Sequence, residues 1–222
     1  MCSQDVLGDL FVEAMPHVCT ARNIKDRAKE LFGKIKAFYK KYQVLNCSKL
    51  QNLTPEMLKK EGKSPKLKAK GAETRHLVPF AVELGKEFHE IVGSSHSLVV
   101  YKMVCALFDI YMSMSTLTFD AKALAEATRK FCVLYSSLSK EAQRDDKPLS
   151  WRAKPKLHLA QEMGEFQSHE VGNPRLFWCY RDESFVGFAA QVISSRGGGG
   201  TASTNPLRAM ERYRALCTID AI

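Results

Sequence analysis

The hydrophobic residues of this chain recur with the period of an α-helix over almost its whole length. Residues 24–42 show this most clearly, because Leu31, Ile35 and Phe38 fall on one stripe with lysines opposite. Such a stripe is typical of a helix that packs on a core. Sustained alternation of polar and apolar residues is missing, apart from a brief ambiguous run at 177–180. We therefore predict an all-α fold, an irregular bundle of about seven to nine helices with a basic N-terminal arm.

Flanking residues help to place the other helices. Met15-Pro16 should end the first of them, and Thr54-Pro55 predicts a later helix start with Thr54 as N-cap. Residues 96–115 are apolar nearly all round, so we expect them to form the central buried helix. Residues 59–70 are polar and carry Gly62 and Pro65, which is typical of a linker. The helices expected from periodicity are 5–14, 24–42, 71–92, 96–115 and 119–142.

Composition narrows the class of protein. The chain has 222 residues, of which 45% are hydrophobic and 26% charged, as in a folded soluble protein. It holds no run of about 18 apolar residues, so we expect no membrane-spanning helix. Asp5, Asp9 and Glu13 interrupt the N-terminal apolar residues, which argues against a secretory signal. Seven cysteines without a C-x-x-C pair indicate free thiols, and we expect an intracellular location.

Positive charge is concentrated in one segment. Residues 22–70 carry fifteen Lys or Arg against four acidic residues, whereas the net charge of the whole chain is +9. A local excess of lysine is typical of a surface that binds a polyanion, although a solvated surface would have the same composition. The candidate nucleic-acid-binding residues are Lys34, Lys36, Lys40, Lys41, Lys59, Lys60, Lys63, Lys66, Lys68 and Lys70.

A second candidate site lies on the helix predicted after residue 155. His158, Glu162, Glu165 and His169 would occupy a sector of about 60° if that helix is regular. Imidazole and carboxylate are ligands for zinc, manganese or iron, so a divalent metal is the alternative to a chain without a cofactor. The first and last of these residues would be about 16 Å apart along the axis, too far to share one ion. A metal site would therefore use His158, Glu162 and Glu165 with Asp182 or Glu183.

The C-terminal part contains a predicted charge cluster. Asp182 is expected to cap a helix and Glu183 to lie in its first turn. Gly197–Gly200 lack the G-K-[ST] of a phosphate-binding loop and are interpreted as a linker. Arginines of the last predicted helix would pair with the acids. The predicted cluster comprises Arg181, Asp182, Glu183, Arg208 and Arg212.

Several short motifs resemble those of a known group of proteins. They include Trp151 with Pro155-Lys156 and His158, then Asn173-Pro174-Arg175, and then Cys179-Tyr180 with Asp182-Glu183. This combination resembles a family of uncharacterised, mobile-element-associated proteins abundant in dinoflagellates. More distantly, the chain is similar to the C-terminal helical region of CACTA-type transposases. The residues that carry this second similarity are Lys66-Leu67-Lys68, Glu73, Arg75, Leu77, Pro79, His158-Leu159, Trp178, Tyr180, Asp182, Glu183, Phe185 and Gly187.

The resemblance implies a nuclear, nucleic-acid-related origin but does not imply catalytic activity, because the sequence shows neither the sheet pattern of a transposase core nor the strands that would hold its three carboxylates. We expect residues 1–70 to form a basic helical arm and linker, and residues 71–222 to form a helical domain. The leading hypothesis is a non-catalytic domain of mobile-element origin that binds DNA or RNA through residues 22–70. The alternatives are a metal-dependent nuclease-like enzyme and a helical protein-interaction module.

Overall fold

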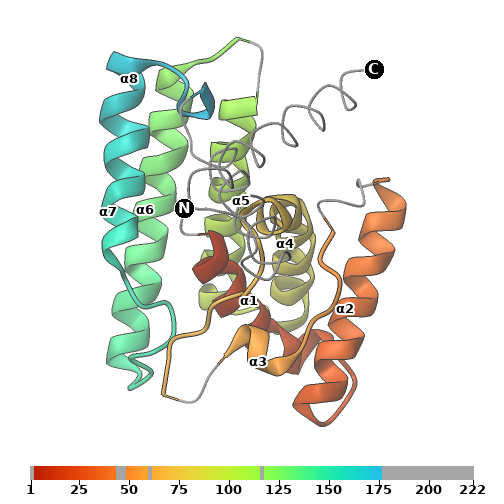
Figure 1. Cartoon of the computed structure of the whole chain (residues 1–222). Coiled ribbons are helices and arrows are strands. Elements are labelled where there is room, and N and C mark those ends of the chain that lie inside the picture. The colour runs from red at the N-terminus through yellow and green to blue at the C-terminus, as the bar shows by residue number, and fades with distance from the viewer. Residues whose placement is uncertain (1–2, 44–48, 60–61, 116–117, 177–222) are drawn as a thin grey trace, which may run out of the picture. The chain divides into compact units, whose positions relative to one another are not determined.

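The computed structural model describes residues 3–43, 49–59, 62–115 and 118–176, which belong to one compact unit. All regular structure in these ranges is helical, and the predicted all-α bundle is confirmed (Figure 1). The α-helices are α1 (Ser3–Val18), α2 (Ile24–Lys41), α3 (Pro55–Leu58), α4 (Gly71–Val92), α5 (Ser95–Ser115), α6 (Ala121–Arg144), α7 (Pro155–Gln161) and α8 (Ser168–Val171). A π-helical segment, η2 (Glu162–Gln167), joins α7 to α8, and a 3₁₀ turn, η3 (Pro174–Leu176), follows.

The centre of the bundle is α5, which packs against α4 and α6. Its apolar surface explains this place, because Val100, Met103 and Val104 are completely buried. By length and composition alone α5 would suffice to cross a bilayer, and half of that stretch is buried inside the bundle. The bundle thus provides a burial partner for the most apolar helix of the chain.

The N-terminal helix is part of the core. Val6, Leu7, Leu10 and Phe11 of α1 are completely buried, and α1 packs extensively on α4. The expected basic arm therefore begins with a core helix. The predicted end at Met15-Pro16 is wrong, since α1 continues to Val18. The last turn is held because Val18 is buried and the backbone N–H of Cys19 donates to Met15 at 3.1 Å.

Capping residues fix several other boundaries. Asn23 accepts from the N–H of Asp26 at the start of α2, and Asp120 accepts from Lys122 at the start of α6, both at 2.8 Å. Gly93 ends α4 with φ 65°, a left-handed conformation that suits glycine. Thr54 precedes α3 as predicted, but its side chain does not cap the helix.

Candidate functional site

The helix that carries the predicted metal ligands is not a regular α-helix. Residues 162–167 form a π-helical turn, in which backbone bonds span five residues. The wider turn changes the angular register, so Glu165 and His169 no longer follow His158 at α-helical spacing. The sector calculated for a regular helix therefore does not apply to this stretch.

The carboxylate of Glu165 is hydrogen-bonded to two other side chains. One carboxylate oxygen accepts from Arg129 Nε at 3.3 Å and the other from Gln161 Nε2 at 3.2 Å. The side chains of His158 and His169 are exposed. Among the residues that the structure describes, no group of three or more His, Cys, Asp or Glu could hold a metal ion. The predicted fourth ligand, Asp182, lies outside the described residues, so the metal alternative has no assembled site to support it.

The predicted charge cluster cannot be placed. Arg181, Asp182, Glu183, Arg208 and Arg212 all lie outside the described residues. The 3₁₀ turn η3, which precedes them, is described. Asn173 accepts from the N–H of Arg175 at 2.9 Å, and its side-chain amide donates to Met114 at 3.1 Å.

Two of the predicted nucleic-acid-binding lysines form ion pairs inside the protein. Lys34 of α2 pairs with Glu87 of α4, and Lys41 pairs with Glu83 at 3.0 Å. Tyr42 donates to the same Glu83 at 2.7 Å. These pairs connect α2 to α4 and neutralise part of the positive charge that the composition suggested.

The other predicted lysines differ in their exposure and partners. Lys68 is exposed, and its ammonium donates to the backbone carbonyl of Glu56. Lys36 lies 5.2 Å from the centre of the Phe32 ring. Lys60 lies outside the described residues. For five further exposed lysines, no ion pair, hydrogen bond or ring contact of the ammonium group is found among the described residues: Lys40, Lys59, Lys63, Lys66 and Lys70.

A largely buried polar cluster is formed by acidic side chains of α1. Asp5, Asp9 and Glu13 follow one another at intervals of four residues and therefore share one face of the helix. Asp9 accepts from the backbone N–H of Trp151 at 3.0 Å, and Glu13 accepts from its indole N–H at 2.7 Å. Asp5 binds Lys154 Nζ at 2.6 Å. Three acids of α1 thus hold the segment that leads from α6 to α7.

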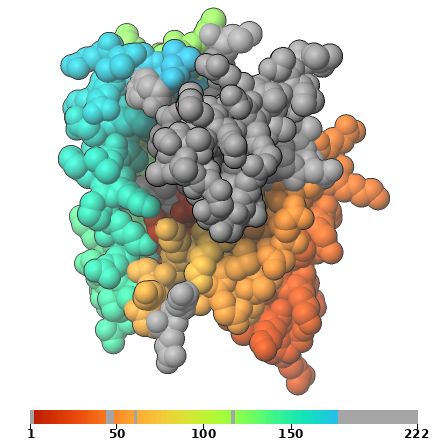
Figure 2. Space-filling view, in the orientation of Figure 1, coloured from red at the N-terminus to blue at the C-terminus, as the bar shows by residue number. Residues whose placement is uncertain are grey.

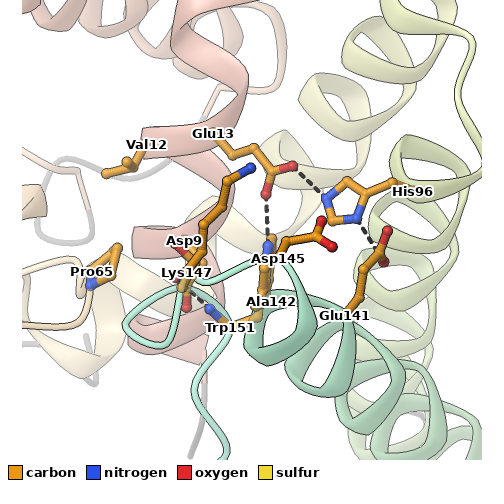
Figure 3. A pocket seen from close by; sticks show the side chains of 11 residues that line it. Asp9, Val12, Glu13, Pro65, His96, Glu141, Ala142, Asp145, Lys147 and Trp151 are labelled. Atoms are coloured by element: carbon orange, nitrogen blue, oxygen red, sulfur yellow. Dashed lines mark hydrogen bonds and ion pairs between the residues drawn. The ribbon is translucent and has the colours of Figure 1, made fainter.

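His96 connects this cluster to α5 and α6. Its Nε2 faces Glu13 at 2.5 Å and its Nδ1 faces Glu141 at 2.9 Å (Figure 3). The hydrogen bond to Glu13, opposed by burial and supported by Glu141, raises the pKa of His96 to about 9. The imidazole is therefore a cation at neutral pH. Because both ring nitrogens donate to carboxylates, His96 is available neither as a general base nor as a metal ligand.

The cluster borders a cavity of about 160 Å³. Asp9 lies on its wall, and burial raises the pKa of that carboxyl to about 8, so Asp9 is neutral at pH 7. Asp9, Glu13, His96 and Trp151 all line this cavity (Figure 3). Cationic His96 thus connects α5 to α1 and α6 through two carboxylates, with neutral Asp9 on the same cavity wall.

The sequence contains one signal for this cluster, the spacing of three acidic residues near its N-terminus. The four-residue spacing of Asp5, Asp9 and Glu13 places them beside the buried residues of α1, where unpaired acids would be costly. Buried acids require partners, and the partners are His96, Trp151 and Lys154. These contacts span as many as 149 residues, so no local pattern could identify them.

Similarity to known proteins does not assign a function to this arrangement. Comparisons of the chain with protein-family models, curated proteins and solved structures find no match. The resemblance to mobile-element proteins therefore remains a prediction from the motifs. The features that bear on function are the basic surface and the buried cluster.

Proposed function

We propose that this chain is a non-catalytic helical domain of mobile-element origin that binds nucleic acid through the lysine-rich surface of residues 22–70. The observation that supports this is a set of five exposed lysines. No ion pair, hydrogen bond or ring contact of their ammonium groups is found among the described residues: Lys40, Lys59, Lys63, Lys66 and Lys70. Unpaired ammonium groups on a surface attract phosphates and release their counterions, which favours association.

The ion pairs of α2 refine which lysines take part. Lys34 and Lys41 are directed to Glu87 and Glu83 of α4, and we assign them a structural role. Glu56 lies within the basic segment, and its pKa is kept low first by a hydrogen bond to its own backbone N–H and one to Thr54, and then by the charges of Lys25 and Lys68. The surface therefore keeps an excess of positive charge after its acids are counted.

The experiment is a binding titration with the full chain and a fluorescein-labelled duplex DNA of random sequence. We expect the affinity to fall steeply with salt, since each phosphate contact contributes about one unit of slope on a log–log plot. Replacing Lys40, Lys59, Lys63, Lys66 and Lys70 with Gln should weaken binding at least tenfold and reduce the slope.

A matched control separates this surface from net charge. Lys102, Lys122, Lys130, Lys140 and Lys156 are also exposed, and their replacement with Gln changes the net charge equally. We expect this control to bind within about threefold of the unmodified chain, because distant charges are screened within a Debye length. Equal losses in both variants, or no binding by the unmodified chain, would contradict the proposal.

A further inference from the structure

The segment of residues 62–70 is bound to the bundle along its backbone. The N–H groups of Lys66 and Lys68 donate to Leu58 and Met57 at the end of α3, at 2.7 and 2.8 Å. The N–H of Leu67, between them, donates to the carbonyl of Gln4 in α1 at 2.8 Å. This part of the expected linker is therefore held from two sides, by α3 and by α1.

Side chains of the segment alternate between the bundle and solvent. Pro65 is buried and Leu67 is completely buried, whereas Lys66, Lys68 and Lys70 are exposed. Residues 49–59 and 62–70, coloured orange to yellow, reach the surface on the face shown in Figure 2. Anchoring by the apolar residues thus determines on which side the lysines stand.

Gly8 of α1 makes this anchoring possible. A Cβ atom added at Gly8 would lie 2.4 Å from the Cα and 2.5 Å from the N of Lys66, and 2.7 Å from the N of Leu67. These are backbone atoms, which cannot rotate away as a flexible side chain would. Gln4 adds a second contact, because its Nε2 donates to the carbonyl of Ala69 at 2.7 Å.

From this geometry we infer that residues 62–70 form a preorganised phosphate-binding ridge, in which Lys63, Lys66 and Lys70 contact the backbone of duplex DNA. The inference rests on the proposed function and specifies its surface and partner. Lys68 stabilises the ridge, because its ammonium donates a hydrogen bond to the backbone carbonyl of Glu56. Fixing the backbone before binding lowers the ordering cost that a free lysine-rich linker would have.

The composition of the ridge favours a duplex over a single strand. Residues 59–70 contain no aromatic side chain on which an exposed base could stack. Single-strand binders combine basic grooves with such stacking. A duplex presents phosphates on its outside and keeps its bases stacked within, so ammonium groups alone suffice for sequence-independent binding.

The decisive variant changes no charge. Gly8→Ala should displace residues 66 and 67, and we expect a threefold to tenfold weaker affinity for duplex DNA with an unchanged salt slope. Trypsin should also cleave after Lys66 and Lys68 faster than in the unmodified chain. If Gly8→Ala does not fold, Gln4→Ala provides the same test. It removes only the hydrogen bond to the carbonyl of Ala69, so we expect a smaller loss of affinity.

The possible outcomes separate this inference from the proposed function. Normal affinity in both variants, with faster cleavage after Lys66, would overturn the preorganised ridge, while loss of binding in the five-lysine variant would still support the proposed function. Tighter binding of the matching single strand, or of vesicles of anionic phospholipid, would overturn duplex DNA as the partner. An unchanged affinity in the five-lysine variant would overturn both.

Discussion

The indole N–H of Trp151 donates to the carboxylate of Glu13 at 2.7 Å, across 138 positions of the sequence. Trp151 has φ 49°, a left-handed conformation that is unfavourable for a bulky residue. Its backbone N–H is bound by Asp9 from the same helix. Two acidic side chains of α1 thus hold a strained residue at the turn between α6 and α7, and the stability of that turn depends on α1.

Replacing Trp151 with Phe tests this dependence. Phe keeps most of the buried ring but removes the indole donor, so we expect unfolding to become easier by about 1–2 kcal/mol. Urea unfolding followed by circular dichroism measures the change. Combining Trp151→Phe with Glu13→Ala gives a double-mutant cycle, and strict additivity of the two losses would contradict a direct interaction.

The raised pKa of His96 predicts that the folded chain becomes less stable at alkaline pH. Its pKa is about 9 in the folded chain and 6.5 in the unfolded reference, so the folded state holds its proton more tightly. The contribution is complete below pH 6.5 and is lost as pH rises through 9. We expect His96→Gln to lower stability by about 1–3 kcal/mol at pH 6 and by much less above pH 9.

The measurement is urea unfolding of both chains between pH 6 and 10. His169→Gln is the matched control, because His169 is exposed and no hydrogen bond or ion pair to it is found among the described residues. We expect this control to follow the unmodified chain at every pH. A loss from His96→Gln that stays constant from pH 6 to 10 would be inconsistent with a charged imidazole.

Asp9 predicts a separate effect in the same pH range. Burial raises its pKa from 3.8 to about 8, so the folded state loses stability as pH rises from 3.8 through 8. Asp9→Asn cannot ionise, yet its amide oxygen still accepts from the N–H of Trp151. We expect the variant to match the unmodified chain near pH 4 and to exceed its thermal stability at pH 8.5. Lower stability of the variant at pH 8.5 would show that Asp9 is needed as an anion.

The sequence predicts much of this fold because helical periodicity and end signals are local. The limits of α4 were predicted correctly from an amphipathic run that stops at Gly93, and α2 was predicted to within one residue. The buried cluster was not predicted, since His96 meets Glu13 and Glu141 only after three helices pack together. The composition of residues 59–70 predicts a linker, although residues 62–70 are held in place by backbone hydrogen bonds. These bonds are to α1 and α3, which lie elsewhere in the sequence, so the composition of the segment does not reveal them.

The π-helical turn of residues 162–167 gives the last prediction. Gly164 lies against Thr128 of α6, and an added Cβ would approach Thr128 Oγ1 to 2.2 Å and its Cβ and Cγ2 to 2.8 Å. Gly164→Ala should therefore push this segment away from α6 and reduce stability by about 1–3 kcal/mol, although alanine favours helix more than glycine does. Thr128→Ala in the same chain removes two of the three clashing atoms and should restore part of the loss.

Gly33→Ala is the control, because no atom lies within 4 Å of a Cβ at that position of α2. We expect it to keep or raise the melting temperature, whereas a rise for Gly164→Ala would show that helix propensity outweighs the contact with Thr128.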